Sequence, residues 1–149
     1  MIQIRPASAA DLPALAVLHQ AALGGPGEQA TLAHLRALAL VYFAAKSDQF
    51  LGVATGQLAA DEFEIHAVAV AEAARGQGLG HRLVRALEQG AREAGAAAAF
   101  LEVRAGNTAA RALYTGLGYT EFGRRPTYYR DGDEAVLMRR DLREPPCGA

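Results

Sequence analysis

Three glycines stand at alternate positions in ARGQGLGHRL, the segment of residues 74–83, and helix-forming residues follow them at once. The first backbone N–H groups of a helix are unpaired and point outward, and the helix dipole adds partial positive charge at the same end. Glycines remove the Cβ atoms that would keep a phosphate away from those N–H groups. Gly76, Gly78 and Gly80 therefore predict an anion site made by the backbone of residues 76–81, with Arg75 as an additional donor.

The same glycines also fit a tight turn between a strand and a helix, with no ligand at all. A Rossmann dinucleotide loop fits less well, because the segment has no G-x-G-x-x-G and the strands before it are expected to be antiparallel. A Walker phosphate loop would need G-K-[ST], which is absent here. On these residues alone, the anion site and the plain turn both stay open.

Hydrophobic periodicity predicts the elements that must position this loop. The expected strands span residues 2–7, 40–45, 50–59, 63–70, 98–105, 119–129 and 134–140. The expected helices carry their apolar residues between positions 12 and 23, 32 and 38, 79 and 91, and 108 and 117. The order is therefore β-α-α-β-β-β-α-β-α-β-β.

Local signals mark where several of these elements begin and end. Ser8 with Asp11 resembles a capping box before the first helix, and Asn107 is a good N-cap for the last one. Gly95 and Gly118 are suited to end the two helices that precede them. The Asp-Gly pair in RDGD, residues 130–133, is a strong signal for a hairpin between the last two strands.

Connection lengths predict how the strands pair. The three consecutive strands between residues 40 and 70 are joined by short turns, which favours antiparallel pairing. The strand at 63–70 reaches the strand at 98–105 through a helix, so these two should run parallel. The expected fold class is α+β, with a mixed, mostly antiparallel twisted sheet and helices on both faces.

Composition limits the possible functions. The 149 residues, 51% hydrophobic and 21% charged, suffice for one domain with its own core. We expect that domain to span residues 1–142 and residues 143–149 to form a flexible tail. A formal net charge of -1 lacks the basic excess with which nucleic-acid-binding proteins neutralise phosphates, so no nucleic-acid partner is expected.

The cysteine and signal patterns favour a cytoplasmic protein. A single cysteine, Cys147, allows no intramolecular disulfide and no zinc-type cysteine spacing. His19, His34 and His81 show no ligand spacing with one another, so no metal is expected. There is no basic-then-apolar leader, and no apolar run approaches the roughly 18 residues of a membrane span, so we expect no membrane association.

Two segments together resemble a known family. VAVAEAARGQGLG at 68–80 contains R-x-x-G-x-G, and LEVRAGNTAARALYTGLGY follows at 101–119. These resemble the acetyl-CoA-binding motifs of the GNAT N-acetyltransferases, and the expected element order is similar to theirs along nearly the whole chain. The second segment, with RRPTYYRDGDEAVLM at 124–138, is most similar to the bacterial ribosomal-protein-alanine N-acetyltransferases, which modify a protein N-terminus.

The resemblance implies a three-layer GNAT-like α/β fold, acetyl-CoA as co-substrate and no metal. It also implies that the end of the strand at 63–70 binds the pantetheine arm through backbone groups, so that the cofactor imitates a strand. Small apolar residues there equally suit an ordinary buried strand. The implied cofactor-binding residues are Val68, Ala69, Val70, Arg75, Gly76, Gln77, Gly78, Leu79, Gly80, His81 and Asn107.

The resemblance also implies two catalytic side chains. An α-amine has a pKa near 8 and must lose a proton before it attacks, and Glu102 is the implied base. Tyr114 is the implied acid, because a phenol can protonate the departing thiolate while remaining neutral at pH 7. Without the motif, Glu102 reads as a solvated glutamate paired with Arg104 or Arg111, and Tyr114 as a core aromatic.

The expected acceptor is the N-terminal α-amine of a protein such as a ribosomal protein. A small-molecule amine is the alternative on the same fold, and a non-catalytic CoA-binding module is a third reading that would need neither Glu102 nor Tyr114. Glu64 is the second choice of base, acting through water. His66 and the Tyr128-Tyr129 pair are candidates for the wall of the acceptor site, although all three also suit plain packing or surface positions.

Overall fold

The computed structural model describes residues 1–25, 27–37, 40–46 and 49–143. Its strands are β1 (Gln3–Pro6), β2 (Leu40–Lys46), β3 (Gln49–Ala59), β4 (Glu62–Val70), β5 (Ala98–Arg104), β6 (Thr120–Arg125) and β7 (Ala135–Asp141). Its helices are α1 (Leu12–Leu23), α2 (Glu28–Ala37), α3 (Leu79–Glu93) and α4 (Thr108–Gly116), with single 3-10 turns at Ala9–Asp11 and Glu72–Ala74.

The expected element order is confirmed. The capping box at Ser8 is also present, since its backbone N–H donates to the Asp11 carboxylate at 2.8 Å. Asn107 caps α4 by accepting from the Ala110 N–H at 3.1 Å. The expected tail lies outside the described residues from position 144 on, and Cys147 with it.

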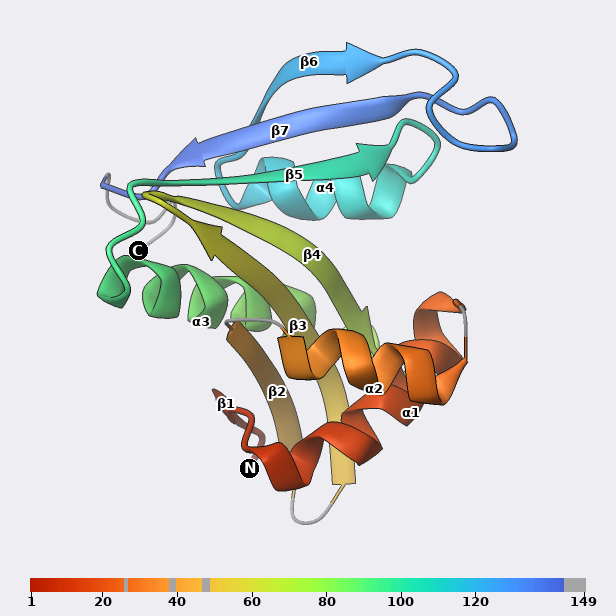
Figure 1. Cartoon of the computed structure of the whole chain (residues 1–149), viewed down its shortest axis with the longest axis vertical. Coiled ribbons are helices and arrows are strands. Elements are labelled where there is room, and N and C mark those ends of the chain that lie inside the picture. Colours follow the sequence, from red (N-terminus) through yellow and green to blue (C-terminus); the bar gives the residue numbers. More distant parts are fainter. Residues whose placement is uncertain (26, 38–39, 47–48, 144–149) are drawn as a thin grey trace.

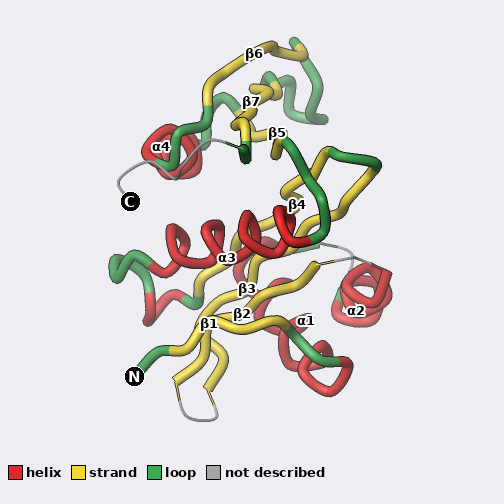
Figure 2. The backbone as a smooth tube through the Cα atoms, turned by 90° about the vertical axis from the view of Figure 1, so that its left-hand side faces the viewer, coloured by secondary structure: helices red, strands yellow, loops and turns green. Residues whose placement is uncertain are grey.

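The strands form one seven-stranded sheet in the order β1-β2-β3-β4-β5-β7-β6 (Figure 1). Every neighbouring pair is antiparallel except β4 and β5, which run parallel as the helical connection between them predicts. Helices cover both faces: α1 and α2 lie on one side of β2–β4, and α3 lies on the other (Figure 2). Among the described residues, no helix is long and apolar enough to cross a membrane.

The sheet opens between β4 and β5. These strands pair over only three residues each, Glu62–Glu64 with Ala98–Phe100, although β4 continues to Val70 and β5 to Arg104. Beyond the paired segment β4 curves away toward α1 while β5 runs on beside β7 (Figure 1). Within the described residues, no strand pairs with the β5-facing edge of the last residues of β4.

The connection between β6 and β7 differs from the sequence prediction. The strand expected at 119–129 ends at Arg125, so Tyr128 and Tyr129 lie in a loop that spans residues 126–134. The physical reason is Pro126, which has no N–H for the ladder, followed by Thr127 at a φ of 50°. The hairpin expected between the last two strands is present, since β6 and β7 pair antiparallel, but its loop is longer than the sequence predicted. Gly132 within that loop adopts a left-handed turn conformation at a φ of 86°.

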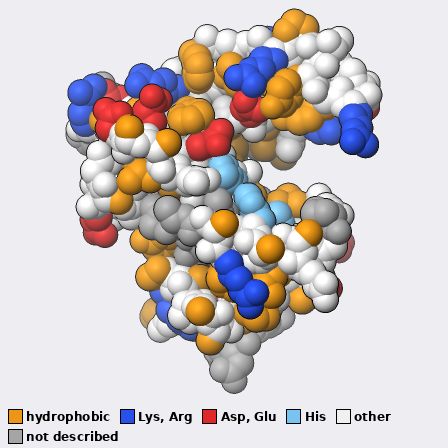
Figure 3. Space-filling view, viewed as in Figure 1, with side chains coloured by type: hydrophobic (Ala, Val, Ile, Leu, Met, Phe, Trp, Pro, Cys, Tyr) orange, Lys and Arg blue, Asp and Glu red, His pale blue; other side chains and the backbone are white. Residues whose placement is uncertain are grey.

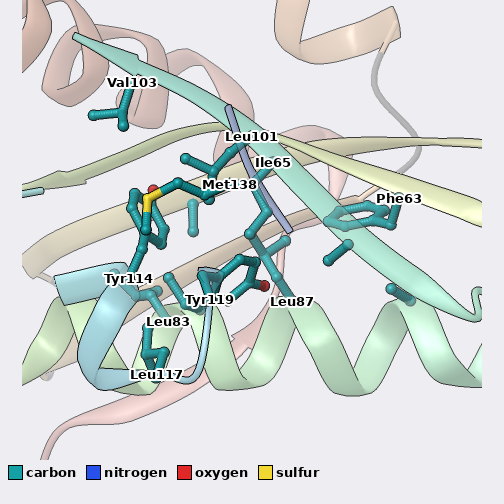
Figure 4. Packing of buried hydrophobic residues seen from close by; sticks show 14 of the residues in the cluster. Phe63, Ile65, Leu83, Leu87, Leu101, Val103, Tyr114, Leu117, Tyr119 and Met138 are labelled. Atoms are coloured by element: carbon teal, nitrogen blue, oxygen red, sulfur yellow. The ribbon is translucent and has the colours of Figure 1, made fainter. Parts of the chain in front are cut away.

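The larger core lies between the sheet and the helices α3 and α4. Its labelled members in Figure 4 come from β4, β5, β7 and both helices, and they pack into one apolar cluster. Glu88 of α3 is completely buried beside this cluster. Its carboxylate accepts from the Tyr119 hydroxyl at 2.8 Å and lies 2.9 Å from Arg85 and 3.1 Å from Arg140 of β7. This charge network therefore joins α3 to the β6–β7 half of the sheet.

We predict that Glu88→Ala destabilises the fold by about 3 kcal/mol or more, because it leaves buried guanidinium charge without its carboxylate. Urea unfolding followed by circular dichroism measures the change. Glu93→Ala is the matched control, since Glu93 lies on the same helix with an exposed side chain and should shift the free energy by no more than about 0.5 kcal/mol. Equal, small effects of the two substitutions would contradict the structural role of Glu88.

Candidate active site

The glycine loop connects β4 to α3 through the 3-10 turn at Glu72–Ala74. Gly76 and Gly78 have φ values of 81° and 76°, the left-handed region that glycine adopts without strain. A Cβ placed on either glycine would meet no heavy atom within 4 Å, so the space in front of the loop is open. The turn conformation and the open approach predicted from the sequence are thus both present at the same residues.

A cavity of about 760 Å³ lies beside this loop, and we call it the loop cavity. It is lined by Ala22 and Leu23 of α1, Val68, Ala69 and Val70 of β4, Ala74, Arg75, Gly76, Gly78, Leu79, Gly80 and His81 of the loop and α3, and Asn107, Ala109, Ala110, Leu113 and Tyr114. All of the cofactor-binding residues expected from the sequence are among them except Gln77. The structure therefore brings the loop, the unpaired end of β4 and the start of α4 around one space.

Two polar residues of this cavity already have partners. Arg75 donates through Nε to the carbonyl of Val70 at 3.1 Å, which ties the loop back to the end of β4. The side-chain oxygen of Asn107 is occupied by its capping bond to the N–H of Ala110. Each residue keeps further N–H groups, and these remain candidate donors to an anion.

Tyr114 is buried, and its ring packs edge-on against Tyr119 at a centroid distance of 5.6 Å. Figure 4 shows it in the cluster below the sheet, near Leu83 and Met138. Burial raises the pKa of Tyr114 to about 12. The phenol therefore stays protonated across the physiological pH range, while its side chain lines the loop cavity.

A second cavity, of about 400 Å³, is lined by His34 of α2, Glu64, Ile65 and His66 of β4, Glu102 of β5, and Tyr128 and Tyr129 of the 126–134 loop. We call it the carboxylate cavity. Leu101 and Val103 point into the core beneath the sheet, so Glu102 points to the opposite face, where this cavity lies. Figure 3 shows the hollow in this region, with the histidine side chains gathered in it.

Glu102 forms an ion pair with Arg125, whose Nη1 lies 3.1 Å from its carboxylate. The guanidinium of Arg125 also lies over the Tyr128 ring, 5.4 Å from the centroid. Neither partner expected from the sequence is used: Arg104 pairs with Asp131 at 2.7 Å, and Arg111 donates to the carbonyl of Ala105 at 3.0 Å. The carboxylate of Glu102 therefore lines the cavity as an ion pair with Arg125.

Glu64 and His66 form a second polar pair in the same cavity. His66 Nε2 lies 2.8 Å from Glu64 Oε1, and the His66 ring stacks on the His34 ring with centroids 5.6 Å apart and planes 17° from parallel. The tautomer with its proton on Nε2 donates a hydrogen bond to this carboxylate and leaves Nδ1 as an acceptor. In the described part of the chain, no group of three or more acidic, histidine or cysteine side chains could hold a metal ion.

Sequence reasoning missed His34, Arg125 and the α1 wall of the loop cavity. His34 stacks on a residue 32 positions away across two elements, and no local pattern signals such a contact. Arg125 was within the quoted motif, but its partner depended on where β6 ends. Of these residues, only Leu23 could have been recognised from the sequence, because it is the last apolar residue of the first helical pattern and so marks the end of that helix.

A sequence model of the acetyltransferase (GNAT) family matches residues 13–119. The chain is similar to the ribosomal protein bS18-alanine N-acetyltransferase of Escherichia coli, with 34% identity over 132 residues that cover 86% of this chain and 89% of that one. It is also similar to the N-alpha-acetyltransferase RimI of Mycobacterium tuberculosis, with 44% identity over 85 residues and 56% of this chain. The chain spans only 52% of the length of that relative and 22% of an uncharacterized Mycobacterium leprae relative.

The fold has a solved counterpart. The crystal structure of the Escherichia coli ribosomal-protein-alanine N-acetyltransferase matches with a TM-score of 0.83 and 31% sequence identity. That match covers 100% of this chain and 96% of the other. The mixed sheet with helices on both faces, expected from the sequence, is therefore confirmed.

The loop cavity predicts a position at which acetyl-CoA binding can be blocked without strain. Gly78 is unsuitable because its φ of 76° would strain any larger residue, whereas a Cβ on Gly80 lies 3.5 Å from Leu113 and 3.8 Å from Val68, in ordinary contact. Gly80→Val should therefore fill the mouth of the cavity and raise the dissociation constant of acetyl-CoA at least tenfold, about 1.4 kcal/mol.

Isothermal titration calorimetry measures this change in affinity. Gly116→Val is the control, since Gly116 is an exposed glycine at the end of α4 with open space around it and outside the cavity lining. An unchanged dissociation constant for a folded Gly80→Val protein would reject the loop cavity as the cofactor site.

Proposed function

The chain belongs to the acetyltransferase (GNAT) family, and on that premise we propose that it moves the acetyl group of acetyl-CoA to a primary amine, the N-terminal α-amine of a protein. The observation that carries the proposal is the opening between β4 and β5, with the loop cavity bordered by the unpaired end of β4 and the carboxylate cavity bordered by residues of both strands. A donor and an acceptor can therefore meet at the opening from two separate cavities.

The loop cavity suits acetyl-CoA in both shape and chemistry. The N–H groups at the start of α3 and the open space at Gly76 and Gly78 suit a diphosphate. The backbone edge of Val68, Ala69 and Val70 has no strand partner among the described residues, so a pantetheine arm can add there as a strand does. Its thioester end would then point toward Tyr114, which lines the same cavity.

The carboxylate cavity suits a cationic amine. Glu64 and Glu102 both face it, and Ile65, Tyr128 and Tyr129 supply apolar walls for the first side chain of a peptide. The names of two relatives support the choice of an α-amine, since one is an N-alpha-acetyltransferase and the other acts on a ribosomal protein alanine. We therefore propose a protein N-terminus, with a ribosomal protein as the first candidate.

The proposed chemistry is direct transfer. Glu102 accepts a proton from the bound ammonium group, and the free amine attacks the thioester carbonyl. Displacement of Arg125 by the incoming ammonium keeps the Glu102 carboxylate paired with a cation throughout binding. The ammonium group of the substrate thereby takes the place of the Arg125 guanidinium in the ion pair with Glu102.

Tyr114 is the proposed donor to the departing sulfur. A thiol has an ordinary pKa of about 8.5, so complete transfer from a phenol of pKa about 12 is uphill by over three units, on the order of 5 kcal/mol. The larger part of its contribution is therefore the hydrogen bond from the neutral O–H to sulfur as negative charge develops there. A charged acceptor strengthens such a bond.

We predict that Tyr114→Phe leaves the affinity for acetyl-CoA unchanged and lowers kcat by about a hundredfold, the usual scale for a proton donor. Release of free thiol measures turnover, and calorimetry measures affinity. Tyr42→Phe, on β2 and outside both cavities, is the matched control and should keep the parent rate. A Tyr114→Phe rate within about threefold of the parent would assign this tyrosine to packing alone.

The acceptor is tested with peptides. A short peptide with a free N-terminal alanine should be acetylated on its α-amine, whereas the same peptide with a blocked N-terminus and a free lysine should not. The two amines differ by over two pKa units, about 3 kcal/mol of deprotonation cost at neutral pH, so a carboxylate serves the α-amine more easily. Mass spectrometry that located the acetyl group on lysine, or turnover of small amines alone, would overturn the assignment.

We further predict that Glu102→Gln depresses the rate most at low pH. There the amine is protonated and needs a base, while above the amine pKa the first proton has already left and the defect should shrink. The measurement is the pH dependence of kcat/KM for the free N-terminal peptide. A Glu102→Gln profile that parallels the parent at every pH would move the role of base to Glu64.

A further inference from the structure

Two side chains of the carboxylate cavity, His66 and His34, have no task in the mechanism above, and Glu64 has no part in its proton transfers. These three side chains are nevertheless in contact with one another. The 2.8 Å contact from His66 to Glu64 restrains rotation of the imidazole within its plane, and the stack on His34 restrains the tilt of that plane. The side chain of His66 is 22% exposed, so solvent reaches part of it.

The backbone gives His66 a special position on β4. In the pairing with β3, Thr55 lies opposite Ala67 and Gly56 lies opposite Ile65, so His66 is the residue left without a partner. Such a bulge turns a side chain away from the regular alternation and is common beside active sites. His66 lies two residues before Val68, where the lining of the loop cavity begins, and it is thus near the opening between β4 and β5.

The overall reaction removes two protons from the nucleophilic nitrogen, at two different stages. An α-ammonium group carries three protons, and the amide product carries one. The first proton must leave before attack, because a protonated amine has no lone pair, and the second must leave afterwards, because the attacking nitrogen becomes positively charged in the tetrahedral adduct. Of the two protons that nitrogen loses, one ends on the departing sulfur and the other in water. The products are therefore the amide, the CoA thiol and one H⁺.

We propose that His66 accepts the second proton, at Nδ1, with Glu64 and His34 as positioning residues. The inference rests on the proposed function, in which Glu102 takes the first proton. The N–H bond of the adduct breaks as the Nδ1–H bond forms, and the electron pair stays on nitrogen. The adduct then collapses: the C–S bond breaks with its electrons going to sulfur, Tyr114 donates a hydrogen bond to the developing thiolate, and one of the two protons taken from nitrogen reaches the sulfur through water.

The chemistry of the surrounding groups suits this role. In model peptides an imidazole has a pKa of about 6.5 and a carboxylate about 4.3, so a neutral imidazole is the stronger proton acceptor at the pH of a cell. The Glu64 carboxylate stabilises the imidazolium that forms, through the hydrogen bond already present at Nε2. Water at the exposed part of the side chain can then take the proton.

Titratable and charged groups line the carboxylate cavity around His66 from several elements. Glu64 lies on its own strand, His34 on α2, Glu102 on β5 with its partner Arg125, and the two tyrosines on the 126–134 loop. Among these described residues, the carboxylate of Glu64 contacts the ring directly, whereas the guanidinium of Arg125 is paired with Glu102.

His66→Gln tests the proposal, because glutamine keeps an N–H donor for Glu64 and removes the proton acceptor. We expect kcat with the N-terminal alanine peptide to fall by about a hundredfold. The decisive readout is the pH profile. The His66→Gln defect should persist above the amine pKa, because attack creates a charged nitrogen at any pH, whereas the Glu102→Gln defect should shrink there.

Two further variants separate proton transfer from packing. In His66→Ala, added imidazole should restore part of the lost rate, which a merely structural residue would not allow. Glu64→Gln should lower kcat while the matched control Glu62→Gln, two residues away on the same strand and outside the carboxylate cavity, should stay within about twofold of the parent.

The possible outcomes are distinct. A parent enzyme that releases no thiol with any free N-terminal peptide contradicts the proposed function and with it this inference. An active parent whose His66→Gln variant keeps its rate overturns the inference alone. So does a defect that vanishes at high pH, because His66 would then serve the first proton.

Discussion

The buried carboxylate of Glu88 connects two halves of a sheet that share only three residue pairs between β4 and β5. It lies on α3, which packs against β2, β3 and β4, and its partners Tyr119 and Arg140 belong to the part of the chain that forms β6 and β7. The short pairing of β4 with β5 determines at which end the sheet opens. The width of the opening depends on how α3 is held to the half of the sheet that contains β6 and β7. Both cavities border that opening, and none of Glu88, Tyr119, Arg85 and Arg140 lines either one. A network outside the two cavities thus holds together the halves that set their spacing.

The two cavities differ in how they are built. The loop cavity draws most of its lining from segments 68–81 and 107–114, whose conformations are set by backbone rules: left-handed glycines, a helix start and an asparagine cap. The carboxylate cavity draws single side chains from α2, β4, β5 and the 126–134 loop. The loop cavity therefore depends on backbone geometry and the carboxylate cavity on side-chain placement. This contrast agrees with the proposal that the first holds an invariant cofactor and the second a variable acceptor.

This difference explains which features of the two cavities could be predicted from the sequence. The element order, the glycine loop and the Asn107 cap were predictable because each depends on residues within a few positions of one another. The Glu102–Arg125 pair was not, because Arg104, an alternative partner, is taken by Asp131 of a loop whose course depends on Pro126 and Thr127. The stack of His34 on His66 was equally hidden, since it needs the packing of α2 against a bulge whose position in β4 leaves no mark in the sequence.

No residue that lines the loop cavity also lines the carboxylate cavity, within the ranges that the structure describes. A substitution in the lining of one cavity therefore leaves the lining residues of the other cavity unchanged. The 126–134 loop joins the outer strand β6 to β7, and it supplies Tyr128 and Tyr129 to the carboxylate cavity but no residue to the loop cavity. On the proposed function, a changed 126–134 loop alters the acceptor side and leaves the lining of the loop cavity intact, in evolution as in a laboratory graft.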